Sequence, residues 1–143
     1  MSSTRRALLD TSVVITGFTN EPAAPNFSSY DELFISALSY SELHFGLVTA
    51  LLESPENYFV RKRRFDSIED VFGIGIPYDD AAADAYGEIL RHIAAGTKDK
   101  KRLRAHTLDK MIAAIALSRE MDLLAKNASG LNGLDELVSI VEI

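Results

Sequence analysis

Residues 7–12 read Ala-Leu-Leu-Asp-Thr-Ser, and this short stretch decides the class of fold. Its first three residues form an apolar run that is typical of a buried strand, and Asp10 stands at the carboxyl end of that run. The next two residues are of the kind that begins helices, and we expect a helix over Val13 to Phe18. A strand followed at once by a helix is typical of α/β proteins.

The same alternation continues outward along the chain. Short apolar runs bounded by turn residues predict further strands, and apolar side chains at helical spacing predict helices between them. Alternating elements of this kind predict one three-layer α/β/α domain over residues 1–143, with a central, mostly parallel sheet of four to five strands. Strands are expected at 7–9, 33–35, 74–77, 122–125 and 137–143. Further helices are expected from Ser39 to Leu52, from Glu56 to Val71, from Asp79 to Ile93 and from Leu108 to Met121, the last capped by Thr107. Loops or turns are expected at 20–29, 97–105 and 127–130.

Composition limits the classes of protein that need to be considered. The chain is 47% hydrophobic and 25% charged, as in globular domains, and no apolar run approaches the ~20 residues that cross a bilayer. Arg5-Arg6 faintly imitates a secretory signal, but Asp10 interrupts the apolar run behind it. With no cysteine, the chain has no disulfide framework and no thiolate site. We therefore expect a cytoplasmic protein with no signal peptide and no membrane partner.

The distribution of basic residues matters more here than the net charge of −6. Nine of the 15 Lys and Arg residues lie in two short stretches, Arg61–Arg64 and Lys98–Arg104. A polyanion responds to the local field as well as to the total charge, so RNA remains a possible partner. The alternative is that both stretches are solvated surfaces. For RNA contact we favour Lys98, Lys100, Lys101, Arg102 and Arg104.

Acidic side chains follow the predicted strands or begin the predicted helices. Asp10 follows the first strand, Glu42 lies in the first turn of the helix after the second, Asp109 begins the helix that leads to 122–125, and Asn127 follows that strand. In a parallel sheet these positions share the edge at the carboxyl ends of the strands. Converging carboxylates repel one another unless a cation separates them, and hard oxygen donors select Mg²⁺ or Mn²⁺. Such an ion suits phosphodiester hydrolysis.

Each of these residues also has an ordinary structural explanation. Asp10 could cap a helix, Glu42 has capping-box spacing from Ser39, Asp109 suits a helix N-terminus, and Asn127 is a common turn residue. The functional interpretation therefore depends on the set rather than on any member. His44 and His106 receive no role, although His106 precedes Asp109 by three residues.

The local sequences also resemble a known family. Leu8-Leu9-Asp10-Thr11-Ser12 resembles the opening strand of PIN domains, residues 39–46 resemble their S-x-x-E-L-x-x-G helix, and residues 109–114 resemble D-x-x-I-A-A. Asn127 follows at the family's T-x-N position. The resemblance implies an Mg²⁺- or Mn²⁺-dependent endoribonuclease. Compact members are mostly VapC toxins, which usually form homodimers and are held inactive by a VapB-type antitoxin.

Carried over to this chain, the resemblance implies that Asp10, Glu42 and Asp109 are metal ligands and that Asn127 takes the fourth position, with Thr11 and Ser12 around the metal. Two positions depart from the family pattern: Ala125 replaces its threonine and Gly130 replaces its further acid, so a second ion would be poorly held. One alternative is a PIN scaffold that binds RNA or a protein without cutting. Another is a phosphatase with Asp10 as nucleophile, disfavoured because Ser12 stands where the second acid is expected.

Overall fold

The computed structural model describes residues 4–18 and 27–143, and its centre is a four-stranded parallel sheet. The strands are β1 (Arg6–Leu9), β2 (Glu32–Phe34), β3 (Asp122–Ala125) and β4 (Ile140–Glu142), in the order β2-β1-β3-β4. Every neighbouring pair is parallel. The predicted α/β class and parallel sheet are confirmed, with β4 shorter than the expected 137–143.

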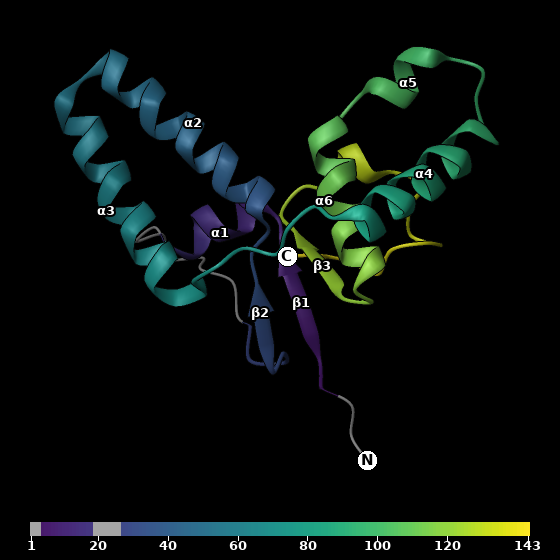
Figure 1. Ribbon diagram of the computed structural model, residues 1–143, viewed down its shortest axis with the longest axis horizontal. Helices are drawn as coiled ribbons and strands as arrows, with labels where there is room; N and C mark the ends of the chain where they lie inside the picture. The colour runs from purple at the N-terminus through teal and green to yellow at the C-terminus, as the bar shows by residue number, and fades with distance from the viewer. Residues whose placement is uncertain (1–3, 19–26) are drawn as a thin grey trace.

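Alternating side chains of the strands build a core on each face of the sheet. Leu8 and Leu123 belong to one buried cluster, which α4 (Asp80–Ala94) and α6 (Thr107–Ser118) complete. Leu9 and Leu124 belong to the other, together with α1 (Thr11–Gly17) and Ile68 of α3 (Pro55–Phe72). Adjacent strand residues point to opposite faces, so this alternation produces the three layers. Figure 1 shows the α2–α3 pair and the α4–α6 helices on opposite sides of the strands.

The second helix begins earlier than its sequence suggests. Helix α2 spans Ala37–Glu53, and Ser36 caps it by accepting a hydrogen bond from the Ser39 backbone N–H. The predicted capping box, with Ser39 as the cap, is therefore wrong. With Ser39 as the cap, the helix would begin at Tyr40. It begins three residues earlier, at Ala37, so Glu42 lies in its second turn and not its first. The physical reason is that the Ser36 hydroxyl can also accept a hydrogen bond from a backbone N–H of the first turn, and the chain turns there because β2 has ended.

The predicted strand at 74–77 is reduced to a single bridge. Ile76 pairs in parallel with Ser36, donating to the Ile35 carbonyl, and accepts from the Ala37 N–H. At Gly75 an added Cβ would lie 2.7 Å from the Ala37 nitrogen. Only glycine lets the two backbones approach so closely, and this close crossing takes the place of a regular edge strand.

The basic segment before α6 is partly helical rather than a loop. Helix α5 spans Lys100–Arg104 and is capped by Asp99, whose carboxylate accepts from the Lys101 N–H. The predicted cap of the next helix is also wrong: His106 holds the cap position of α6, and the Thr107 hydroxyl instead donates to the Arg104 carbonyl. The tight α5–α6 junction therefore leaves Thr107 inside the helix.

Two remaining observations concern the ends and loops of the fold. The second half of the predicted turn at 127–130 is part of a short 3₁₀ helix, η1 (Ser129–Leu131). Of the loop expected at 20–29, residues 20–26 fall outside the described part. Over residues 4–18 and 27–143, no helix has both the length and the hydropathy that crossing a membrane requires.

Candidate active site

Asp10 continues the first strand into the edge of the sheet. Its N–H donates to the Leu124 carbonyl at 2.9 Å, which extends the β1–β3 pairing by one residue. Its side chain makes no cap hydrogen bond to α1; it accepts instead from the Ser12 hydroxyl at 3.1 Å. The carboxylate is thus held at the carboxyl edge without serving the helix that follows.

A chain of hydroxyl groups holds Glu42. The Thr11 hydroxyl donates to Oε1 of Glu42 at 2.5 Å, and Thr11 Oγ1 lies 2.8 Å from Oγ of Ser39. Ser36 Oγ lies a further 3.3 Å from Ser39 Oγ. Ser36 and Ser39 are fully buried. Neither serine was predicted to support the site, and their three-residue spacing at a helix start was the available signal.

Asp109 links the three acids electrostatically. It lies in the first turn of α6. Burial is the main cause that raises the pKa of Asp10, and the charge of Asp109 raises it further. Hydrogen bonds from the Thr11 backbone and the Ser12 hydroxyl lower it. Burial chiefly raises the pKa of Glu42, the Thr11 hydrogen bond lowers it, and the charges of Asp10 and Asp109 raise it again. The fold therefore gathers three mutually repelling carboxylates from β1, α2 and α6.

His106 occupies the space beside Asp109 that Gly130 leaves open. Its Nδ1 lies 3.7 Å from Oδ2 of Asp109. A Cβ added at Gly130 would lie 2.9 Å from the His106 ring and 3.0 Å from Oδ2 of Asp109. The position where the family resemblance implies a further acid is thus next to Asp109, and the imidazole of His106 takes up the space beside it.

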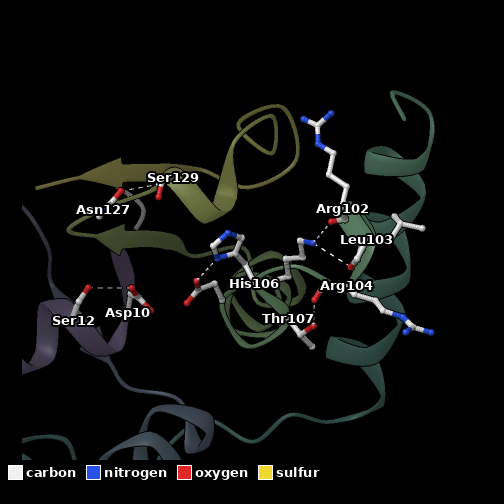
Figure 2. A network of polar contacts seen from close by, with 11 residues as sticks. Asp10, Ser12, Arg102, Leu103, Arg104, His106, Thr107, Asn127 and Ser129 are labelled. Carbon is white, nitrogen blue, oxygen red and sulfur yellow. Dashed lines mark hydrogen bonds and ion pairs between the residues drawn. The ribbon is translucent and has the colours of Figure 1, made fainter. Parts of the chain in front are cut away.

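Asn127 takes part in a turn. Its side-chain oxygen accepts a hydrogen bond from the Ser129 N–H at 3.0 Å. Figure 2 shows this pair opposite Asp10 and Ser12, across the edge of the sheet. The amide is thus near the site, with its oxygen engaged by the backbone of η1.

The five basic residues favoured for RNA contact all lie exposed around α5. The backbone carbonyls of Arg102 and Leu103 accept hydrogen bonds from Nζ of Lys110, which is only 3% exposed. Burial, and after it the charge of Arg102, lowers the pKa of Lys110. This buried ammonium fastens the basic segment to α6, one residue from Asp109.

The three acids fit a divalent cation by the chemistry of their oxygen atoms and by their mutual repulsion. As placed, however, no three His, Asp or Glu side chains in the described ranges are arranged to hold a metal ion. The donor set has the oxygen chemistry that suits Mg²⁺ or Mn²⁺, but the side chains as placed do not form a closed metal site.

A groove of about 290 Å³ adjoins Glu42. It is lined by Glu42 and by apolar side chains of α2 and α3, and it carries Arg61 and Arg64. Beyond it, large apolar side chains of α2 and α3 are exposed, among them Phe45, Leu52 and Phe59. An exposed apolar surface of this kind marks a site of interaction.

The fold and the acidic edge together define the class of protein. The sequence model of the PIN domain matches residues 7–135. This chain therefore belongs to the PIN-domain family. No curated protein matches the chain by sequence.

Solved structures with the same fold include chains from toxin–antitoxin systems. The chain is similar to a chain of VapBC-5 from Mycobacterium tuberculosis, a member of the VapBC family of toxin-antitoxin systems, with a TM-score of 0.73 and 24% identity over 96% of this chain and 97% of the other. FitAcB from Neisseria gonorrhoeae matches with a TM-score of 0.73 and 24% identity, covering 95% and 96%. DNA-bound VapBC from Salmonella typhimurium matches with a TM-score of 0.71 and 21% identity, covering 97% and 98%.

Proposed function

We propose that this protein is a metal-dependent endoribonuclease and the toxin of a VapBC-type toxin–antitoxin pair. The observation that carries the proposal is the grouping of Asp10, Glu42 and Asp109 at the carboxyl edge of a PIN-domain sheet, close enough for their charges to act on one another. Carboxylates kept together at an energetic cost are typical of a functional site. The similarity to toxin–antitoxin structures over nearly the whole chain supports the toxin assignment.

Asp10, Glu42 and Asp109 would hold one Mg²⁺ or Mn²⁺. When bound, such an ion activates water and neutralises charge on the phosphoryl group. Thr11 positions Glu42 through its hydroxyl, and Ser12 does the same for Asp10. The exposed cations of α5 would attract the RNA backbone. Asn127 would contribute the fourth corner through the second lone pair of its side-chain oxygen, whose first accepts the Ser129 N–H.

The test is cleavage of RNA by the purified full chain with Mg²⁺ or Mn²⁺, with and without chelator. We expect Asp10→Asn and Asp109→Asn each to lower the cleavage rate at least ~100-fold, because each removes a charged oxygen ligand. Asp84→Asn is the matched control, since Asp84 is an exposed acid on α4. Full activity in both site variants, or in the presence of chelator, would refute the assignment.

The antitoxin would bind the groove beside Glu42. An amphipathic segment would place apolar side chains between α2 and α3 and acidic ones against Arg61 and Arg64. A partner in this groove would cover Glu42 and the apolar side chains around it, and we expect it to inhibit the enzyme. A homodimer is the other partner implied by the family.

The groove can be tested with a VapB-type antitoxin that binds this chain. We expect Leu47→Glu, which puts a charge on the groove wall, to weaken antitoxin binding at least tenfold, as loss of a buried contact does. Val71→Glu is the control, because Val71 is exposed on α3 and does not line the groove. Equal affinity of both variants would exclude this groove. Circular dichroism of each variant establishes that it is folded.

A second function is favoured by one specific observation. Since no described acids form a ready metal site and Gly130 replaces the further acid, a PIN scaffold that binds RNA without cutting it is the alternative. Metal titration distinguishes the two functions. Saturable Mn²⁺ binding in the millimolar range or tighter, lost in Asp10→Asn, supports the nuclease; its absence supports the scaffold.

A further inference from the structure

A second cavity lies on the far side of His106 from the acids. It has a volume of about 390 Å³, within the range of small-ligand sites. Helices α4, α5 and α6 and the segment around Gly130 enclose it. His106 lines this cavity while its ring also contacts Asp109. The cavity and the candidate active site therefore share one side chain as a wall.

The lining of the cavity is basic and planar. Its ionisable residues are His92, Arg102, His106 and Lys110, and none of the described residues that line it is acidic. The Lys110 ammonium is taken up by two backbone carbonyls, so Arg102 supplies the exposed positive charge. Two imidazoles and one guanidinium provide flat faces, on which nucleobases stack. Ile93 and Leu134 add apolar wall, which a simple anion would not use. A ligand with a planar ring and a negative charge fits both properties.

The fold holds His106 beside this cavity in an unfavourable backbone conformation. His106 adopts a left-handed backbone, with φ of 54°, which is unfavourable for a residue with a Cβ. This conformation places its ring beside Gly130, where a side chain would collide with it. The Lys110 ammonium holds the carbonyls of Arg102 and Leu103, so α5 is fixed over the cavity. In the view of Figure 2, His106 lies between Asp10 and Arg102.

We propose that this cavity binds one nucleotide of the RNA, the residue adjoining the phosphodiester at the acids. Its base would stack on His106 or Arg102, and its phosphate would lie against the basic lining. The proposal deepens the proposed nuclease function and rests on it for the identity of the ligand. It also gives Arg102 a role that the other four basic residues around α5 do not share, because none of them lines the cavity.

The chain contains three histidines, so their imidazole signals report binding directly by NMR. The experiment adds nucleoside 3′-monophosphates to the metal-free full chain in chelator at fixed pH. We expect the signals of His92 and His106 to shift saturably. His44 lies on α2 against the Phe65 ring, outside the cavity, and its signal should stay unchanged.

Three variants and one control locate the binding. Arg102→Ala should weaken nucleotide binding about tenfold, the effect expected from one stacking and charge contact. His106→Ala should do the same, whereas His106→Phe, which keeps a flat ring, should retain most of the affinity. Arg63→Ala, a matched change on exposed α3, should have no effect. An unchanged His44 signal establishes that each variant is folded.

Two results would overturn the proposal. One is the absence of a saturable shift at His92 and His106 at millimolar nucleotide. The other is an equal shift with inorganic phosphate, which would show an anion site only. Because no metal and no cleavage are involved, the result is independent of the nuclease assay. Nucleotide binding by a chain that cuts no RNA would contradict the proposed catalysis and leave this inference standing.

Discussion

The Thr11 hydroxyl donates a hydrogen bond to Oε1 of Glu42 at 2.5 Å, joining residues that are 31 positions apart. Thr11 begins α1 directly after the first strand, and Glu42 lies on α2. The bond therefore ties the carboxylate of one helix to the junction that presents Asp10. Its removal tests whether the acidic edge is organised by hydroxyl groups.

Thr11→Val keeps the shape of the side chain and removes this donor. Since the bond lowers the pKa of Glu42, the variant should raise that pKa further. We also expect a loss of about 1–2 kcal/mol in the free energy of unfolding, as for a hydrogen bond to a charged group. Carboxyl ¹³C NMR and urea denaturation measure the two effects. Thr11→Ser should restore both, and an unshifted Glu42 titration would contradict the role of Thr11.

Asp10→Asn should stabilise the metal-free protein at pH 7. Burial and the charge of Asp109 raise the pKa of Asp10, so folding favours its protonated form. The stability from this group is present below the ordinary aspartate pKa of about 3.9 and is lost as pH rises through the raised folded pKa. A neutral amide avoids that loss, and we expect a gain of about 1 kcal/mol at pH 7.

The same reasoning predicts how the gain depends on conditions. In urea denaturation with chelator, the difference between Asp10→Asn and the parent should disappear near pH 3. Mn²⁺ should stabilise the parent more than the variant, because only the parent keeps the anionic ligand. Asp84→Asn should change neither curve. A variant less stable than the parent at pH 7 would mean that the Asp10 carboxylate is structural.

Gly130→Ala should destabilise the protein by about 1 kcal/mol, because the added methyl group must displace the His106 ring. Gly96→Ala is the matched control: its Cβ would meet nothing closer than the Ile93 carbonyl at 3.7 Å. Thermal denaturation of both variants provides the comparison. If both variants lower the stability of the protein by the same amount, the contact between Gly130 and His106 is not tightly packed.

Gly130→Asp combined with His106→Ala tests whether an acid at position 130, which the family pattern has and this chain lacks, strengthens metal binding. The second change makes room, and the first adds a carboxylate beside Asp109. Like charges repel, so the metal-free double variant should be less stable than the single His106→Ala variant. Its affinity for Mn²⁺, measured by calorimetry, should be at least about tenfold higher, as expected for an added oxygen ligand. Unchanged affinity would place the metal elsewhere.

Lys110→Met should destabilise the α5–α6 junction. The change keeps the buried stem and leaves the carbonyls of Arg102 and Leu103 without their charged donor, at a cost of about 2–3 kcal/mol. Hydrogen exchange should become faster at the Ala105 amide, which closes α5. Lys101→Met, at an exposed position on the same helix, is the control. Equal exchange in both variants would refute the fastening role of Lys110.

Much of the fold was predictable because its signals are local. The apolar run of β1, the strand at 122–125 and the helix after Asp79 are each specified by neighbouring residues, and the structure confirms them. The sequence also placed Asp10 after a strand and Asp109 in the first turn of a helix, as the structure has them. The position of a residue relative to a helix or strand follows from the spacing of apolar residues and from the residues that begin or end the element. Both signals act within a few residues.

Only the tertiary structure decided which side chains meet. Ser36 rather than Ser39 caps α2 because β2 ends there, and the freed Ser39 then reaches Thr11 from another part of the chain. His106 fills the space of Gly130 because α6 and η1 pack together, a contact that spans 24 positions. Side-chain contacts of this kind depend on packing in three dimensions, and local patterns carry no information on them.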